Sequence, residues 1–293
     1  MYYRRKVLLA LLQTWGGILS NISFQKILFL FCQEQEKPSY TFVPYKYGCF
    51  SFQSYADRRA LVYYNVLAND NSWHKIDNKD YYSELEMSDK KILYNLYDKY
   101  KNFSQKDLIQ HVYIHYPYYA TNSEILYDHL TETEINAVIK NKNLTSCSFL
   151  ATIGYEGLSI DEYLNKLLCN NIEVIFDVRK NPVSMKFGFS KQILKKYLNK
   201  LDIAYIHIPQ LGIESNKRKN LKCENDFHLL FKEYEEKVIP TNTQYINKII
   251  EAFNKYNRIA LMCFESYHLS CHRHKIIEAI VKLPSWSNKI LHL

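Results

Sequence analysis

Two cysteines, a glutamate and a Cys-His-Arg triplet lie close together near the end of the chain. The segment begins with Cys263 and Glu265, continues through SYHLS, and ends with Cys271, His272 and Arg273. A thiol can act as a nucleophile, a carboxylate or an imidazole as an acid or base, and a guanidinium group can bind an anion. The segment therefore predicts a catalytic or ligand-binding site.

A metal site is one interpretation of this segment. Cys263 and Cys271 are eight positions apart, and the short paired spacings that are typical of zinc ligands are absent. We therefore predict no metal ligands and no cofactor. A thiol- or metal-dependent enzyme that uses these two cysteines stays open as the weaker alternative.

The triplet is expected to open a helix, because CHRHKIIEAI follows a loop and has helical spacing of its apolar residues. A helix amino terminus beside His272 and Arg273 would lower the pKa of Cys271, which makes Cys271 a candidate nucleophile. Burial in the core is the competing interpretation of either cysteine. Anion binding by Arg273, Arg179 and the free amides of the helix start is the prediction that we favour.

Other polar or special residues follow the predicted strands of the same region. In an open parallel sheet, ligands bind outside the carboxyl ends of the strands, where the connecting loops meet. We therefore expect one shared site at this edge of the sheet. Its candidate ligand-binding residues at the strand ends are Gly154, Tyr155, Glu156, Arg179, Gly212 and Cys263, with His207 interpreted as a core residue.

Asp177 and Arg179 are two positions apart at the end of VIFDVRK, so their side chains should point to one side of the strand. The pair could serve as a base with a phosphate clamp, or it could be a structural ion pair. Glu265 and Glu156 are the other candidate acids or bases, and Tyr155 could stack on a nucleotide base. Asp177, Glu265 and Cys271 are the candidate catalytic residues.

The elements that must position these residues alternate between short apolar runs and helical patterns. Residues 144–293 therefore predict a Rossmann-like, three-layer α/β domain with a mostly parallel sheet. Strands are expected at FLATIGYEG, EVIFDVRK, AYIHIP, RIALMCFE and KILHL, and helices at 159–169, 190–200, 224–238, 242–256 and 271–282.

Residues 1–143 predict an α-rich, winged-helix-like domain. A first helix should stop at Gly16-Gly17, and Ser20, Ser88 and Ser104 are expected to cap later helices. The short extended piece at 72–76 could form a wing. The basic start of the chain imitates a signal peptide, but its uninterrupted apolar run ends at Leu12, which favours an amphipathic helix.

Composition restricts the class of protein. The 293 residues are 47% hydrophobic and 23% charged, which is typical of a globular protein and excludes a disordered chain. Seven cysteines without paired spacing favour a reducing compartment, and no apolar run reaches the ~18 residues that a bilayer requires. We expect a cytoplasmic protein with no membrane partner. The sequence does not indicate an oligomeric state.

The net charge is +8, and the chain from residue 148 onward holds 21 Lys and Arg against 15 Asp and Glu. The basic residues gather in two segments. One is the spaced series Lys186, Lys191, Lys195, Lys196 and Lys200, and the other is KRKNLK at 217–222. Such clusters suit a nucleic acid or a nucleotide, although a solvated basic surface is an equal alternative.

Four blocks in this half resemble, in order, the motifs of the domain of unknown function 488 family. They are TIGYEG, DVRKNPVS, the PQLG turn, and CFE followed by CHR. The resemblance implies an α/β domain and adds Ser184 to the candidate ligand-binding residues. Members of this family resemble bacterial proteins suspected of acting on nucleic acids, nucleotides or bases in DNA modification and defence.

The first half more loosely resembles the Panacea antitoxin-type domain. The shared pieces are Gln25-Lys26-Ile27-Leu28 and Tyr47-Gly48-Cys49, with Cys49 in place of the usual proline.

We therefore hypothesise an enzyme that acts on a nucleotide or nucleic acid, delivered by the helical half. The alternative is a non-catalytic DNA- or partner-binding module that senses a small ligand.

Overall fold

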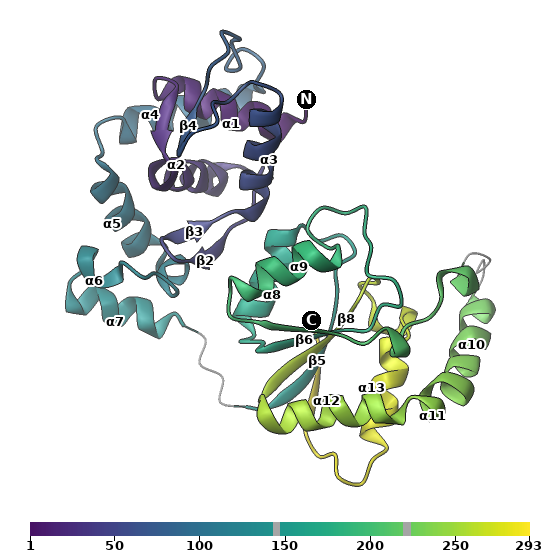
Figure 1. Ribbon diagram of the computed structural model, residues 1–293. Coiled ribbons are helices and arrows are strands. Elements are labelled where there is room, and N and C mark those ends of the chain that lie inside the picture. The colour runs from purple at the N-terminus through teal and green to yellow at the C-terminus, as the bar shows by residue number, and fades with distance from the viewer. Residues whose placement is uncertain (143–146, 219–223) are drawn as a thin grey trace. The chain divides into compact units, whose positions relative to one another are not determined.

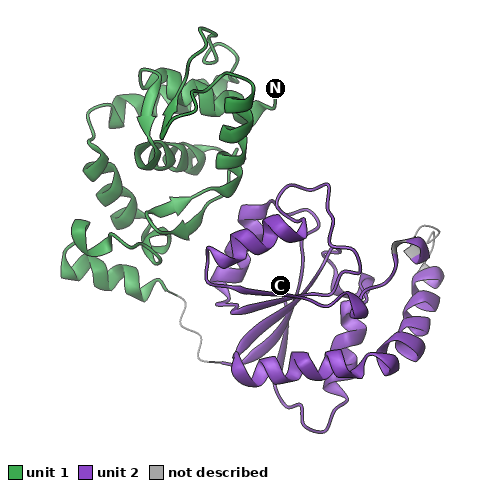
Figure 2. Cartoon of the chain, viewed as in Figure 1, with its two compact units in different colours: residues 1–143 green, residues 144–293 purple. Residues whose placement is uncertain are grey.

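The computed structural model describes residues 1–142, 147–218 and 224–293. The chain divides into two compact units, Met1–Asn143 and Leu144–Leu293 (Figure 2). Each unit has its own hydrophobic core. Of the basic cluster at 217–222, residues 219–222 lie outside the described residues, as does most of the predicted junction around residue 144.

The N-terminal unit is mainly helical and carries two small antiparallel sheets (Figure 1). Its elements are α1 (Tyr3–Thr14), β1 (Ile18–Ser20), α2 (Asn21–Glu34), β2 (Val43–Tyr45), β3 (Gly48–Phe50), α3 (Phe52–Tyr63), β4 (Ser72–His74), α4 (Met87–Tyr100), α5 (Gln105–His115), α6 (Leu126–His129) and α7 (Glu132–Lys140).

Most predicted helix boundaries of this unit are confirmed. Gly16 and Gly17 follow α1 with φ of 81° and 87°, a conformation that favours glycine. Ser20 caps α2, and Ser104 forms a capping box with Asp107 at the start of α5. The prediction for Ser88 is wrong, because α4 begins at Met87 and leaves Ser88 inside the helix.

The extended piece predicted at 72–76 is β4, which pairs with β1. Its central residue, Trp73, is fully buried and stacks on Phe24 at a ring-centroid distance of 3.8 Å. The strand therefore supplies an aromatic residue to the core of the N-terminal unit. A winged-helix fold for this unit stays a prediction.

The C-terminal unit is an α/β domain around a five-stranded parallel sheet with the order β7-β6-β8-β5-β9, which confirms the predicted fold class. Its elements are β5 (Phe149–Gly154), α8 (Ile160–Cys169), β6 (Val174–Asp177), α9 (Lys191–Asn199), β7 (Ala204–His207), α10 (Glu224–Glu233), α11 (Ile239–Thr241), α12 (Thr243–Lys255), β8 (Arg258–Cys263), α13 (Arg273–Val281) and β9 (Lys289–His292).

The helices cover both faces of this sheet, with α8 and α9 on one face and α12 and α13 on the other (Figure 1). The central strands are buried on both faces, and every residue of β5 and β6 is buried. Continuous apolar runs are the expected pattern for such strands. The parallel arrangement brings the carboxyl ends of β5, β6 and β8 to one edge of the sheet.

None of the helices in the described ranges has the length and apolar character that a bilayer crossing demands.

Candidate functional site

A pocket of about 530 Å³ opens at the carboxyl edge of the parallel sheet. Its residues come from the end of β8 and from the segments that follow β5, β6, β7 and β8, including the loop between β6 and α9 and the residue just before α13. The lining residues are Tyr155, Arg179, Lys180, Asn181, Val183, Ser184, Met185, Lys186, Ile213, Cys263, Phe264 and His272. Three of them are basic and none of them is acidic, so the pocket offers a cationic surface.

Asp177 and Arg179 form a buried ion pair beside this pocket. Arg179 donates to both carboxylate oxygens, from Nε to Oδ1 at 2.8 Å and from Nη2 to Oδ2 at 2.6 Å. The hydroxyl of Tyr205 donates to the same carboxylate at 2.6 Å, and the backbone N–H of Arg179 donates to it at 3.1 Å. Asp177 is thus a buried acceptor with four donors.

The guanidinium group of Arg179 is also fixed on its other side. Nη1 donates to the hydroxyl of Tyr155 at 3.0 Å and to the carbonyl of Phe189 at 2.9 Å. Burial alone would lower the pKa of Arg179, but the hydrogen bonds and charge of Asp177 outweigh it and raise that pKa. Arg179 is therefore a rigid, permanently charged residue of the pocket wall.

Tyr155 packs as part of the wall. Its ring stacks on Phe189 at 4.2 Å and meets Phe264 edge-on at 5.2 Å. Phe264, in contrast, is 42% exposed and lines the pocket. The aromatic ring that is accessible for stacking is thus Phe264, a residue that the sequence analysis did not select.

Arg273 binds the loop after β8. Its Nη1 donates to the carbonyl of Glu265 at 2.6 Å and its Nη2 to the carbonyl of Ser266 at 2.9 Å. Arg273 is buried and is not among the residues that line the pocket. The structure thus differs from the expected joint anion site of Arg179 and Arg273, because this guanidinium is engaged with backbone carbonyls.

Two further predicted residues hold the same loop. Glu156 accepts hydrogen bonds from the backbone N–H of Ser266 at 3.0 Å and from its hydroxyl at 3.2 Å. At Gly154, a Cβ atom would lie 1.8 Å from the carbonyl oxygen of Glu265, so only glycine allows this close approach. Gly154, Glu156 and Arg273 together fix the position of the loop that carries Glu265.

Gly212 lies at a close approach to the loop that carries Ser184 and Lys180. A Cβ atom at Gly212 would lie 2.1 Å from the backbone nitrogen of Lys180, so glycine is required where these two loops meet. Ser184 lines the pocket, and its hydroxyl accepts from the backbone N–H of Lys186 at 3.2 Å. The side chain of Lys186 reaches back to the carbonyl of Tyr155 at 3.2 Å.

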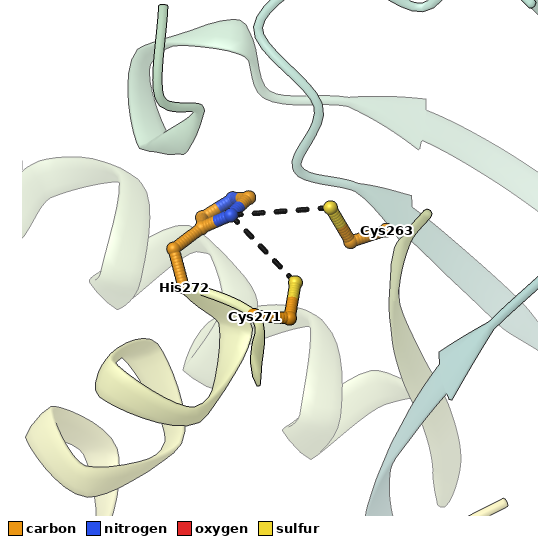
Figure 3. A group of neighbouring side chains, drawn as sticks. All are labelled: Cys263, Cys271 and His272. Carbon is orange, nitrogen blue, oxygen red and sulfur yellow. Dashed lines mark hydrogen bonds between the residues drawn. The ribbon is translucent and has the colours of Figure 1, made fainter. Parts of the chain in front are cut away.

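Cys263, Cys271 and His272 meet at the inner end of the pocket (Figure 3). The Nδ1 atom of His272 lies 3.9 Å from Sγ of Cys263 and 3.7 Å from Sγ of Cys271. Sγ of Cys263 also lies 3.3 Å from Oε2 of Glu265. The fold therefore gathers two thiols, an imidazole and a carboxylate in one place.

The prediction that Cys271 lies in the first turn of a helix is wrong. Helix α13 begins at Arg273, while Cys271 has extended backbone angles (φ −135°, ψ 138°) and a buried side chain. Burial, followed by the nearby Cys263 and Glu265, raises the pKa of the Cys271 thiol well above its ordinary value. Cys271 is therefore not a thiolate stabilised by a helix amino terminus.

The predicted residues that line the pocket are Tyr155, Arg179, Ser184, Cys263 and His272. Asp177 pairs with Arg179, Glu265 contacts Cys263, and Cys271 lies beside His272, but these three residues do not line the pocket. The sequence analysis missed Tyr205 and Phe264. The sequence offered one clue to each of these residues. Tyr205 lies on a predicted strand of the same sheet, and Phe264 lies between Cys263 and Glu265.

No curated protein and no solved structure matches this chain. The N-terminal unit is not covered by a family match, and its resemblance to the Panacea domain stays a prediction. Residues 159–280, which carry Asp177, Arg179 and the segment from Cys263 to Arg273, match the family model described as Domain of unknown function DUF488.

Proposed function

We propose that the C-terminal unit binds a phosphate group of a nucleotide or of a nucleic acid in this pocket and acts on that ligand as an enzyme. One observation carries the proposal: the pocket lining contains Arg179, Lys180 and Lys186 but no acidic residue. Cationic groups that face a concave site favour an anionic ligand. Lys180 and Lys186 are the candidate donors to this ligand, and Arg179, whose N–H groups mostly donate within the protein, contributes its fixed positive charge.

The remaining lining residues suit the non-phosphate part of such a ligand. The exposed ring of Phe264 offers a surface on which a base can stack, and Asn181 offers both a donor and an acceptor for a base or sugar. Ser184 adds a hydroxyl to the phosphate side. A nucleotide therefore fits the chemistry of the lining better than a simple inorganic anion.

Glu265 is the best candidate for the acid or base. Glu265 is not itself a lining residue, but its Oε2 atom lies 3.3 Å from Sγ of Cys263, which lines the pocket. Glu265 is half-buried, and its loop is held by Gly154, Glu156 and Arg273. Asp177 is a weaker candidate because four donors already saturate its carboxylate, so we assign Asp177 the role of positioning Arg179. We expect the bond that is cleaved to be a phosphoester or a glycosidic bond.

The first test measures ligand binding. A fluorescent single-stranded oligonucleotide and a set of nucleoside monophosphates are titrated into the protein and into Lys180→Ala and Lys186→Ala. Loss of one charge-assisted hydrogen bond costs about 1.5–3 kcal/mol, so each variant should bind about 10- to 100-fold more weakly. Nucleosides that lack the phosphate should bind poorly to all of them.

Lys166→Ala is the matched control. Lys166 is exposed in the last turn of α8, and this helix runs from the pocket edge back to the opposite edge of the sheet. Its removal changes the net charge by the same amount without touching the pocket. Equal losses in all three lysine variants would mean non-specific charge attraction and would refute the proposed site.

The catalytic part of the proposal needs its own variant. Glu265→Gln preserves the size of the side chain but removes its ability to take a proton, so it should bind the ligand and fail to convert it. Products of nucleotides and of plain and modified DNA are followed by mass spectrometry. A Glu265→Gln protein with the turnover of the wild type would contradict the assignment of Glu265.

The second candidate function is a non-catalytic module that senses a nucleotide, with DNA or a partner protein contacted by the N-terminal unit. The saturation of Asp177 favours it, because the ion pair at the pocket has a structural explanation without catalysis. It predicts DNA retention that weakens with salt and survives Glu265→Gln. Under either candidate function, we propose a cytoplasmic role in bacterial DNA modification or defence.

A further inference from the structure

We infer that Cys263, Cys271 and His272 form a binding site for a zinc-like divalent metal ion at the inner end of the pocket. Their ligating atoms all lie within 4.8 Å of one another. Cys263, Cys271 and His272 are 2%, 0% and 0% exposed, so surrounding protein atoms shield all three from bulk solvent. Two thiolates and an imidazole are ligands that zinc prefers.

The distances fit a tetrahedral ion. With Zn–S near 2.3 Å and Zn–N near 2.0 Å, the sulfur and nitrogen ligands of a tetrahedral site lie about 3.6 Å apart. Nδ1 of His272 is 3.9 Å from one sulfur and 3.7 Å from the other (Figure 3). Shifts of a few tenths of an ångström would therefore bring both sulfur–nitrogen distances to the tetrahedral value, and the two sulfur atoms, which lie within 4.8 Å of each other, would have to approach to about 3.8 Å.

A hydrogen bond behind the ring orients His272 for this role. Its Nε2 atom lies 3.0 Å from the carbonyl oxygen of Val178. Because a carbonyl only accepts, Nε2 carries the proton, and the lone pair of Nδ1 faces the two sulfurs. Metal-bound histidines commonly have such a carbonyl partner, which fixes both the tautomer and the ring orientation.

The site leaves one coordination position open. Cys263 and His272 line the pocket whereas Cys271 lies behind them, so a fourth ligand would enter from the pocket. Glu265 is outside the three-ligand group, yet its Oε2 atom is 3.3 Å from Sγ of Cys263. Three protein ligands with an open position are typical of a catalytic zinc site, in which the fourth ligand is water or substrate.

This inference goes beyond the proposed function and can fail or succeed without it, because metal binding is measured with no nucleotide present. The protein is purified with reduced thiols, stripped with a chelator and reloaded with zinc. Its metal content is then determined by inductively coupled plasma mass spectrometry. We expect one zinc ion per chain.

Cobalt provides a direct view of the ligands in the wild-type protein. Titration with Co²⁺ should produce the strong visible absorption of a tetrahedral ion and the near-ultraviolet charge transfer of thiolate ligands. Cys263→Ser, Cys271→Ser and His272→Gln should each weaken zinc binding by more than about 100-fold, since loss of a mere supporting residue costs about 10- to 100-fold. Cys147→Ser, which changes an exposed cysteine, should leave it unchanged.

The cobalt spectrum keeps the inference testable even if a ligand variant fails to fold. Substoichiometric zinc in the reloaded wild type, an octahedral cobalt spectrum, or a Cys263–Cys271 disulfide that resists reduction would each overturn it. Nucleotide binding by a protein that holds no metal would leave the proposed function standing and remove only the metal site.

Discussion

Asp177 accepts two side-chain hydrogen bonds from Arg179, at 2.8 and 2.6 Å, and both residues are buried. Because Arg179 also lines the candidate pocket, this ion pair both stabilises the C-terminal unit and fixes the position of a pocket residue. The desolvation of two charges is compensated only while both partners are present. Removal of either one should therefore cost much more than removal of a surface ion pair.

We predict that Asp177→Ala lowers the free energy of unfolding of the C-terminal unit by about 3–5 kcal/mol, because it leaves the charge of Arg179 buried without its partner. Urea denaturation measures the loss, and hydrogen-exchange mass spectrometry assigns it to peptides of this unit. Tyr205→Phe removes a single donor to the same charged carboxylate and should cost about 1.5–3 kcal/mol. An Asp177→Ala protein as stable as the wild type would contradict the structural role given to the pair.

We predict that Gly154→Ala destabilises the C-terminal unit by at least about 1–3 kcal/mol, the usual cost of forcing extra atoms into a packed site. The new Cβ would lie 1.8 Å from the carbonyl oxygen of Glu265, and backbone cannot move aside as a flexible side chain can. The expected signature is faster hydrogen exchange in peptides that contain residues 263–266.

Gly157→Asn is the control for this substitution. Gly157 has a φ of 79° with open space around it, and asparagine tolerates this backbone region better than other side chains. We expect a loss of up to about 1 kcal/mol from the backbone strain at this φ, with unchanged hydrogen exchange in peptides that contain residues 263–266. Similar losses at both positions would mean that the contact between Gly154 and the Glu265 loop has no special importance.

The parallel sheet and its polar edge could be predicted from sequence because buried strands leave a strong pattern. Every residue of β5 and β6 is buried, and both strands stand out as short apolar runs between loops. The rule that ligands bind at the carboxyl ends of such strands then pointed to the residues around Arg179. Local pattern and global fold agree there.

The metal ligands could not be predicted by the same means. Spacing rules recognise ligands that lie in one turn or hairpin, whereas Cys263 ends a strand and His272 precedes a helix. The loop between Cys263 and His272 folds back so that these two residues lie side by side, and Arg273 and Glu156 hold this conformation by binding the loop backbone. Cys271 was assigned to the helix since helical periodicity does not mark the first residue, and element boundaries are where such patterns are weakest.

We predict that Asp57→Asn destabilises the N-terminal unit by about 1.5–3 kcal/mol, because the two arginines that lose their charged partner are themselves partly exposed. Asp57 is buried and accepts from Nε of Arg4 and from Nε of Arg5, each at 2.6 Å. Burial alone would raise the pKa of Asp57, but the two arginines outweigh it and lower that pKa, which means that they stabilise the charged form. The folded-state pKa lies below the unfolded one, so this stabilisation is present above the unfolded pKa and is lost as the pH falls through the folded one.

Asp70→Asn is the matched control, since Asp70 is an exposed carboxylate of the same unit that pairs with His74. Exposed pairs contribute about 0–1 kcal/mol. Urea denaturation at neutral pH compares the two variants. If they lose the same free energy, the pairing of buried Asp57 with Arg4 and Arg5 does not stabilise the folded unit.

The last prediction concerns the response of the N-terminal unit to acid. Burial, followed by the positive charges of His115 and Lys99, lowers the pKa of His111 from 6.5 to about 4. The ring of His115 lies 4.1 Å from that of His111, and Nε2 of His111 is 2.8 Å from the hydroxyl of Tyr100, which can donate to a neutral imidazole. The folded unit therefore holds His111 in its neutral form.

The unfolded chain binds a proton at His111 below about pH 6.5, whereas the folded unit does so only near pH 4. Within this window the unfolded state binds more protons, so the free energy of unfolding must fall as the pH falls. Urea denaturation at several pH values between these limits gives the slope. His111→Asn should flatten it, whatever its effect on stability at neutral pH, and an unchanged slope in that variant would exclude His111 as its source.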